Sequence, residues 1–193
     1  MDSYYTEGEL SGLGLKHVGK GVRLSRKVSL YGAEGISIGD YSRIDDYCIL
    51  SGEINIGRYV HIAAYSALFG GKAGIVLEDC ATVSSRNSIY AANDDYSGMA
   101  LSSGAPEDYR QITSKSVCLK FCSILGSGCV VLPGVTLEEG AAVGALSLVN
   151  SDVPAWSICG GVPCQKLKER KKNMRRLANQ LLAEKHDYDS LEG

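Results

Sequence analysis

An aliphatic residue recurs at every sixth position of this chain in two long runs. The first run comprises Ile38, Ile44, Leu50, Ile56, Ile62 and Leu68, and the second comprises Leu119, Leu125, Val131, Leu137, Val143 and Val149. With this content of Leu, Ile and Val, two such runs would arise by chance in about one of a thousand sequences. The period is therefore a property of the fold.

Each unit pairs a large aliphatic position with a small one. Small residues stand four positions after many of the aliphatics, at Ser42, Cys48, Ser66, Ala81, Ser123, Cys129, Ala141 and Ser147. Such a unit is too short for a helical repeat, and the strands of a sandwich come about every 8–12 residues. A parallel β-helix, in which each unit is a short strand and a corner, fits the spacing. We expect this all-β coil over residues 24–164, preceded by an N-terminal segment at 1–23.

The composition agrees with a narrow interior. The chain has 193 residues with 23 glycines, four prolines, two phenylalanines and one tryptophan, so Leu, Ile and Val must supply the core. Glycine at the corners relieves the strain of a positive φ. Such a composition is not typical of disordered or collagen-like chains.

Several classes of protein are disfavoured by the same data. No apolar stretch is long enough to span a bilayer, and the first residues lack the apolar core of a secretory signal, so we expect a cytoplasmic protein without membrane insertion. The seven cysteines form no CxxC pair, so we expect reduced thiols and no metal. The net charge of −2 does not favour nucleic acid as a partner.

The C-terminal segment 165–193 is predicted to form an amphipathic helix and a tail. Apolar residues recur at helical spacing, at Leu167, Met174, Leu177, Leu181 and Leu182. Residues 166–193 hold eight basic and five acidic residues, so an anionic ligand is expected to meet this part. The apolar stripe packs on the coil in one interpretation, and the first turn binds a phosphate-bearing cofactor in the other.

The period is interrupted between about residues 90 and 118. The intervening segment is polar and carries Asp94, Asp95, Tyr96, Tyr109 and Arg110, which are side chains suited to holding a polar substrate. A connection of this length inside a compact domain is usually functional or disordered. We therefore expect a substrate-binding excursion here, with a trimer-contact arm as the alternative.

The last coils resemble those of a known family. The sequence GSGCVVLPGVTLEEGAAVGALSLVNSDVPAWSICGGVPCQKLK, within residues 118–168, is similar to the terminal coils of the hexapeptide-repeat acyltransferases, above all the galactoside and maltose O-acetyltransferases. A looser resemblance covers residues 24–118. It implies a left-handed β-helix, a homotrimer with active sites between subunits, and acetyl-CoA as the cosubstrate.

The resemblance also assigns expected roles to residues. It implies that the pantetheine arm runs past Ser127 and Ala145, and that Lys168 meets the phosphates. An arginine of the family is replaced here by Gln165, so Lys166 is expected to substitute for it. The catalytic histidine of the sugar O-acetyltransferases would fall at Asp94, and no histidine is nearby.

His61 is the histidine within the repeats, and it is expected to point outward at a corner. Acyl transfer to an alcohol needs a base with a pKa near neutrality, which histidine supplies. The HIA segment is similar to a histidine-bearing stretch of the sugar-nucleotide and lipid-A acyltransferases, although their base corresponds to Ala64. Our first hypothesis makes His61 the base, oriented by Asp94 or Asp95 across a subunit interface. The second makes Asp94 the base.

These observations predict an acetyl-CoA-dependent enzyme that acetylates a sugar hydroxyl for a surface polysaccharide such as O-antigen or capsule. The first alternative is an N-acetyltransferase acting on a nucleotide-linked amino sugar, because an amine attacks a thioester with less help from a base. A non-catalytic β-helix scaffold is the alternative of another class. A γ-type carbonic anhydrase needs three histidines on zinc, which the coil does not supply.

Overall fold

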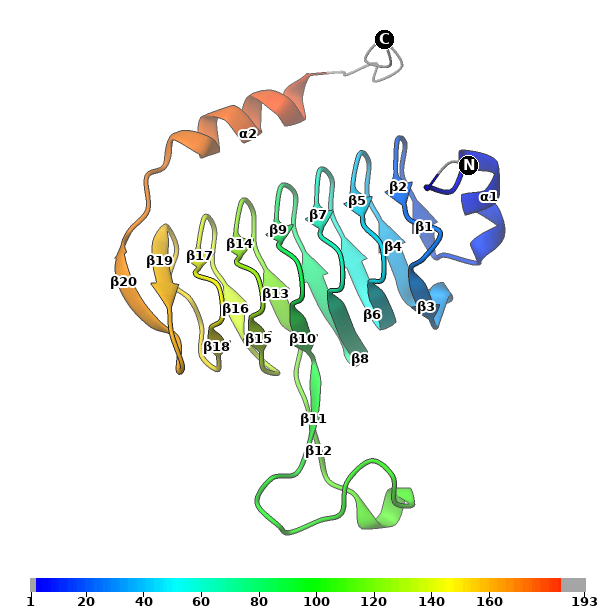
Figure 1. Ribbon diagram of the computed structural model, residues 1–193, viewed down its shortest axis with the longest axis vertical. Coiled ribbons are helices and arrows are strands. Elements are labelled where there is room, and N and C mark those ends of the chain that lie inside the picture. Colours follow the sequence, from blue (N-terminus) through cyan, green and yellow to red (C-terminus); the bar gives the residue numbers. More distant parts are fainter. Residues whose placement is uncertain (1–2, 185–193) are drawn as a thin grey trace.

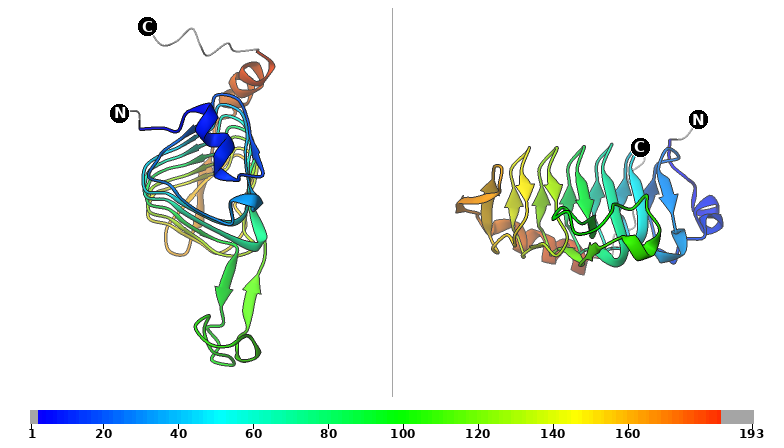
Figure 2. Two further views of the ribbon diagram at one scale, coloured as in Figure 1. Left: turned by 90° about the vertical axis from the view of Figure 1, so that its right-hand side faces the viewer. Right: turned by 90° about the horizontal axis from the view of Figure 1, so that it is seen from below.

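A left-handed parallel β-helix of about seven turns forms the body of the molecule (Figure 1). The computed structural model describes residues 3–184. The coil has a triangular section, which the end-on view in Figure 2 shows. The predicted β-helix is confirmed.

Three faces make up the coil. The first face contains β2 (Arg23–Leu24), β5 (Arg43–Ile44), β7 (His61–Ile62), β9 (Thr82–Val83), β14 (Ile124–Leu125), β17 (Ala142–Val143) and β19 (Ser157–Gly160). The second contains β3 (Ser29–Tyr31), β10 (Ser88–Tyr90), β15 (Val130–Val131), β18 (Leu148–Val149) and the first parts of β6 (Ile49–Ile56) and β8 (Ala67–Leu77). The third contains β1 (His17–Val18), β4 (Ile36–Ile38), β13 (Val117–Leu119), β16 (Thr136–Leu137) and the last parts of β6 and β8.

The hexad aliphatics form ladders inside the coil. Ile62 pairs with Ile44 on one side and with Val83 on the other, and Val83 pairs in turn with Leu125. All four side chains are fully buried. Burying one such side chain stabilises the fold by roughly 1.5–3 kcal/mol. The six-residue period therefore arises because each coil must present its aliphatics to the equivalent positions above and below.

The corners between faces hold the residues that turn the chain. Between the first and second faces the turns lie at 25–27, 45–47, 63–65, 84–86, 126–128 and 144–146, which we call the first corner. Gly128 in this corner has a φ of +72°. The sequence predicts glycine at such positions, but nine other residues, four of them tyrosines, also have positive φ within residues 3–184.

The excursion leaves the coil after β10 and returns at β13. Its stalk is an antiparallel hairpin of β11 (Ala92–Asp94) and β12 (Ile112–Ser114), and its tip includes the 3₁₀ turn η3 (Glu107–Tyr109). Figures 1 and 2 show the hairpin projecting away from the coil at the corner between the second and third faces. The sequence predicts a loop in this region, and the structure adds a regular stalk to it.

The N-terminal segment covers the first turn of the coil. It contains α1 (Glu7–Leu10) and η1 (Ser11–Leu13), and Leu10 is buried against the core. A further turn, η2 (Ala33–Gly35), precedes β4. The coil already begins at β1, which pairs with β4, and therefore starts before the expected residue 24.

The C-terminal helix begins later than the sequence predicts. Residues 165–169 form strand β20 (Gln165–Glu169), which pairs antiparallel with β19 and covers the edge of the first face. Helix α2 follows at Asn173–Ala183. Within the described residues Ala178 is its one buried residue, and Leu177 remains 56% exposed. The predicted tail from 185 onward lies outside the described residues.

Candidate functional site

Asp94 lies at the root of the excursion. It is the last residue of β11, pairs with Ile112 of β12, and is partly buried. Within residues 3–184 its carboxylate makes no hydrogen bond or ion pair. The carboxylate is therefore available to accept a proton from a ligand.

Asp95 differs from its neighbour, because its carboxylate is occupied. Its oxygens accept hydrogen bonds from the backbone N–H groups of Ser97 at 2.9 Å, Met99 at 2.8 Å and Ala100 at 3.1 Å. The bonds from the side chain and backbone of Ser97, with those from Met99 and Ala100, lower the pKa of Asp95 to about 2. A carboxylate with so low a pKa is a weak base. Asp95 organises the loop.

The predicted substrate-binding residues of the tip are only partly brought together. Tyr109 and Arg110 line one open hollow with Met99 and Leu101. Arg110 donates from Nη1 to the Ser103 carbonyl at 3.4 Å. Its Nε is buried without a partner in the described part of the chain.

Tyr96 stands apart from this hollow. Its side chain is 89% exposed, and it is not among the residues that line the hollow of Tyr109 and Arg110. The Tyr96 side chain is therefore accessible on the surface of the tip.

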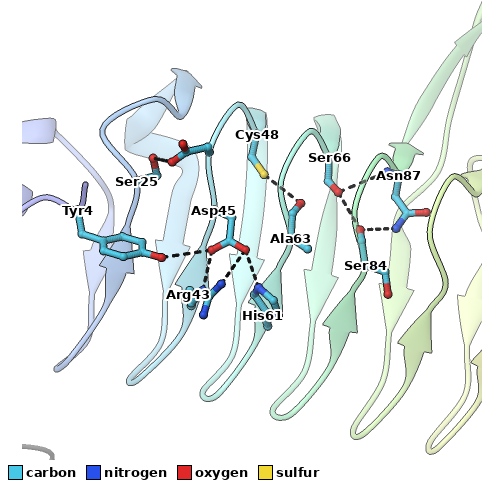
Figure 3. Close-up of polar contacts among 11 residues, drawn as sticks. Tyr4, Ser25, Arg43, Asp45, Cys48, His61, Ala63, Ser66, Ser84 and Asn87 are labelled. Atoms are coloured by element: carbon cyan, nitrogen blue, oxygen red, sulfur yellow. Dashed lines mark hydrogen bonds and ion pairs between the residues drawn. The ribbon is translucent and has the colours of Figure 1, made fainter. Parts of the chain in front are cut away.

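His61 belongs to a charged cluster on the first face. Its Nε2 lies 2.9 Å from Asp45 Oδ2, and Arg43 donates to both Asp45 oxygens at 2.6 and 3.0 Å (Figure 3). Burial raises the pKa of Asp45, but the hydrogen bonds from Arg43 and His61 outweigh it and leave the pKa lowered. His61 projects from strand β7 and not from a corner.

His61 and Asp94 do not meet within one chain. Strand β7 lies in the first face, whereas β11 leaves at the opposite corner of the triangular section. Figure 1 shows β7 at the upper edge of the coil and β11 below its lower edge. A pairing of the two side chains would need a second subunit, and it stays a prediction.

The expected cofactor residues occupy two regions. Ser127 and Ala145 lie in successive turns of the first corner, where Leu146 N–H donates to the Ser127 carbonyl at 2.9 Å. Lys166 and Lys168 lie on β20, and both are exposed. Lys166 forms an ion pair with Glu169.

Sequence reasoning missed the turn of the first corner at residues 84–86. Ser85 Oγ lies 3.4 Å from Ser127 Oγ, so this turn continues directly into the expected cofactor region. The buried Asn87 donates to the Ser84 carbonyl at 2.6 Å (Figure 3). It also accepts from Cys129 N–H at 2.7 Å. Asn87 thereby joins the coils before and after the excursion. An asparagine at a small interior position was the available signal.

No group of three or more His, Cys, Asp or Glu side chains in residues 3–184 is arranged to hold a metal ion. None of the helices in that range has the length and apolar character needed to cross a membrane.

Comparison with known proteins identifies the class. No protein-family model matches the chain. A curated relative from Escherichia coli, dTDP-4-amino-4,6-dideoxy-D-glucose acyltransferase, is 43% identical over 179 residues, which cover 91% of this chain and 93% of the relative. The galactoside O-acetyltransferase of E. coli (strain K12) is 40% identical over 45 residues, or 23% of this chain and 22% of that protein. The chain belongs to the hexapeptide-repeat acyltransferases.

A solved structure is similar to this chain over nearly its whole length. AntD, an N-acyltransferase from Bacillus cereus, matches with a TM-score of 0.92 and 45% identity over 94% of this chain and 98% of that chain. Its structures include complexes with dTDP-4-amino-4,6-dideoxyglucose and coenzyme A, and with dTDP and 3-hydroxybutyryl-CoA. The likeness to amino-sugar acyltransferases spans nearly the whole chain, whereas the likeness to the galactoside enzyme is confined to a short segment.

Proposed function

We propose that this protein transfers an acyl group from a coenzyme A thioester to the amino group of a dTDP-linked 4-amino-4,6-dideoxy sugar. The observation that carries the proposal is the similarity to two amino-sugar acyltransferases over more than nine tenths of the chain. It favours the predicted alternative, N-acylation, over the first expectation of a sugar hydroxyl. A non-catalytic scaffold is not supported.

The proposed base is Asp94. An amino group must lose a proton as it becomes an amide, and this transfer needs a nearby acceptor. Asp94 has a carboxylate without a partner in the described residues, whereas Asp95 is bound to three backbone amides and His61 is bound to Asp45. Asp94 takes one proton from the ammonium form of the acceptor, and the neutral amine attacks the thioester carbonyl. As the C–S bond breaks, the nitrogen loses its second proton to the departing thiolate, so the products are the amide and the thiol of coenzyme A. This step requires no metal or covalent enzyme intermediate.

The remaining predicted residues take supporting roles in the proposal. Ser127 and Ala145 border the pantetheine arm, because their small side chains leave the first corner open. Lys166 and Lys168 supply positive charge for the phosphates. Tyr96, Tyr109 and Arg110 lie on an excursion that projects from the coil, which fits a homotrimer in which an excursion closes on the neighbouring subunit.

A matched pair of acceptors tests the proposed function. Purified protein is incubated with dTDP-4-amino-4,6-dideoxyglucose and either acetyl-CoA or 3-hydroxybutyryl-CoA, and thiol release and product mass are measured. The control acceptor is dTDP-6-deoxyglucose, which has a hydroxyl in place of the amine. We expect turnover of the amine alone. Turnover of the hydroxyl compound at a comparable rate would restore the O-acylation hypothesis.

A further inference from the structure

The first corner carries an unusual column of side chains in its N-terminal half. Tyr47 and Tyr65 stack with ring centroids 5.0 Å apart. Lys27 Nζ lies 5.1 Å from the Tyr47 ring, and Arg86 lies 5.7 Å from the Tyr65 ring. We call Lys27, Tyr47, Tyr65 and Arg86 the corner ridge. It ends beside the Ser84 and Ser85 turn, next to the expected cofactor region.

Packing alone does not account for the two tyrosines. Tyr47 and Tyr65 have φ values of 61° and 62°, a conformation that costs a residue with a Cβ roughly 1–2 kcal/mol. They remain 49% and 56% exposed, so little apolar burial offsets this cost. The same conformation recurs in the other turns of this corner, at Arg86, Gly128 and Leu146, so the corner itself requires it. Glycine would adopt it without this cost, and two exposed tyrosines in its place point to a role in binding.

The tyrosines of the corner between the third and first faces provide a contrast. Tyr41 and Tyr59 have the same left-handed conformation and stack at 5.1 Å, yet both are less exposed than the ridge tyrosines. The Tyr41 ring covers Gly21, where an added Cβ would come within 2.6 Å of it. These two side chains therefore have a packing role.

The arrangement of the ridge determines what it can recognise. Each tyrosine ring has one face against the other ring and the opposite face against a cation, so a planar base cannot insert between them. The hydroxyl edge of Tyr65 and the guanidinium of Arg86 remain for a ligand. Phenol O–H and guanidinium N–H groups are donors, and phosphate oxygens accept from both.

The charge balance places the anion near Arg86. Lys27 is neutralised by Asp46, whose Oδ2 lies 2.7 Å from Nζ. Arg43 and Asp45 likewise pair with each other. Arg86 is exposed, and within the described residues its guanidinium contacts the Tyr65 ring and no carboxylate. A diphosphate would supply the missing negative charge.

We infer that the corner ridge binds the diphosphate of the nucleotide-linked acceptor, with Arg86 and the Tyr65 hydroxyl as its principal contacts. This inference rests on the proposed function and adds the location of the acceptor. The acceptor then enters along the N-terminal half of the first corner, while coenzyme A occupies the C-terminal half at Ser127 and Ala145. The two reactants meet at the turn of residues 84–86.

Binding of dTDP, measured by isothermal titration calorimetry, tests the inference. The variants are Arg86→Met, Arg86→Lys and Tyr65→Phe, and the matched control is Tyr59→Phe in the other tyrosine column. We expect Arg86→Met to weaken dTDP about tenfold or more and Tyr65→Phe to weaken it less. Arg86→Lys should recover part of the loss, and Tyr59→Phe should bind as the wild type does. The KM for acyl-CoA should stay unchanged throughout.

The outcomes distinguish a failure of this inference alone from a failure of the proposed function. If wild-type protein does not bind dTDP, both fail. If wild-type protein binds dTDP and Arg86→Met binds it equally well, the role of the ridge in binding the diphosphate is overturned and the proposed function stands. Thymidine, which lacks phosphate, serves as the second ligand. An equal loss of thymidine binding in Arg86→Met would indicate a structural effect and would also overturn the inference.

Discussion

The coil and the excursion differ in how far their side chains are buried. In the coil each residue has equivalents one turn above and below, so Leu125 is fully buried between Val83 and Val143. In the excursion the side chains have no such neighbours, and Leu101 is 58% exposed. The repeated coils bury their side chains against one another. The excursion, which does not repeat, leaves its side chains exposed for a ligand or a second subunit.

This difference explains why we propose that the chemistry occurs where the repeat stops. A residue inside the ladder cannot change without disturbing its neighbours, because interiors are closely packed. A hairpin stalk can present a carboxylate such as Asp94 without loss of core contacts. The coil is therefore expected to determine stability, and the excursion to determine turnover.

The largest effect should come from removing the excursion. Residues 94–112 are replaced by an Asn-Gly turn that joins Asn93 to Thr113, which face each other across the stalk. We expect acyl transfer to fall to background, while circular dichroism retains the β-helix signal. Residual turnover above one tenth of wild type would show that the chemistry lies on the coil.

Paired leucine substitutions sharpen the contrast in stability. Leu125→Ala in the coil should lower the free energy of unfolding by about 2–5 kcal/mol, because it leaves a cavity in the ladder. Leu101→Ala in the excursion should change it by less than about 0.5 kcal/mol. Thermal or urea unfolding measures both. Equal losses would mean that the excursion shares the core of the coil.

A smaller, pH-dependent effect is expected at Asp95. Its folded pKa of about 2 lies below the ordinary value, so its contribution to loop order is complete above about pH 4 and is lost as the pH falls toward 2. Asp95→Ala should expose the tip to pepsin more than wild type at pH 4.5. The two proteins should be cleaved alike at pH 2. A difference that persists at pH 2 would contradict this role.

The smallest effect on turnover is predicted for His61. If Asp94 is the base, His61→Asn should leave kcat within about twofold of wild type, because the cluster with Asp45 and Arg43 is confined to the first face. Its steady-state kinetics should be compared with those of Thr82→Ser, on the neighbouring strand of that face. A hundredfold loss in His61→Asn alone would return the base to His61.

The fold was predictable because periodicity is a property of the sequence. The six-residue spacing of Ile44, Leu50 and Ile56 predicts which side chains face inward, and the interruption after Ile89 predicts the excursion. The C-terminal boundary was less accessible. Residues 165–169 stand at the start of the segment in which apolar residues recur at helical spacing, but they form a strand because they pair with the open edge of β19. This depends on a tertiary neighbour that a local pattern does not contain.

The candidate site was predictable only in part. Asp94 and Asp95 are adjacent and chemically alike, and hydrogen bonding to the backbone of the loop tip distinguishes them. Arg86 and Tyr65 lie 21 positions apart in the sequence. They become neighbours because one coil here contains three residues more than the regular repeat of 18. Contacts of this kind follow from the stacking of coils.

Substitution of Asp94 tests the central claim most directly, when the kinetics are combined with two controls on one protein. With dTDP-4-amino-4,6-dideoxyglucose as acceptor, Asp94→Asn should lower kcat by about 10²–10⁴-fold. The Tm and the affinity for dTDP should match those of wild type, since Asp94 supports neither the ladder nor the corner ridge. A kcat within threefold of wild type would contradict the account, because the carboxylate of the excursion would then not be the base.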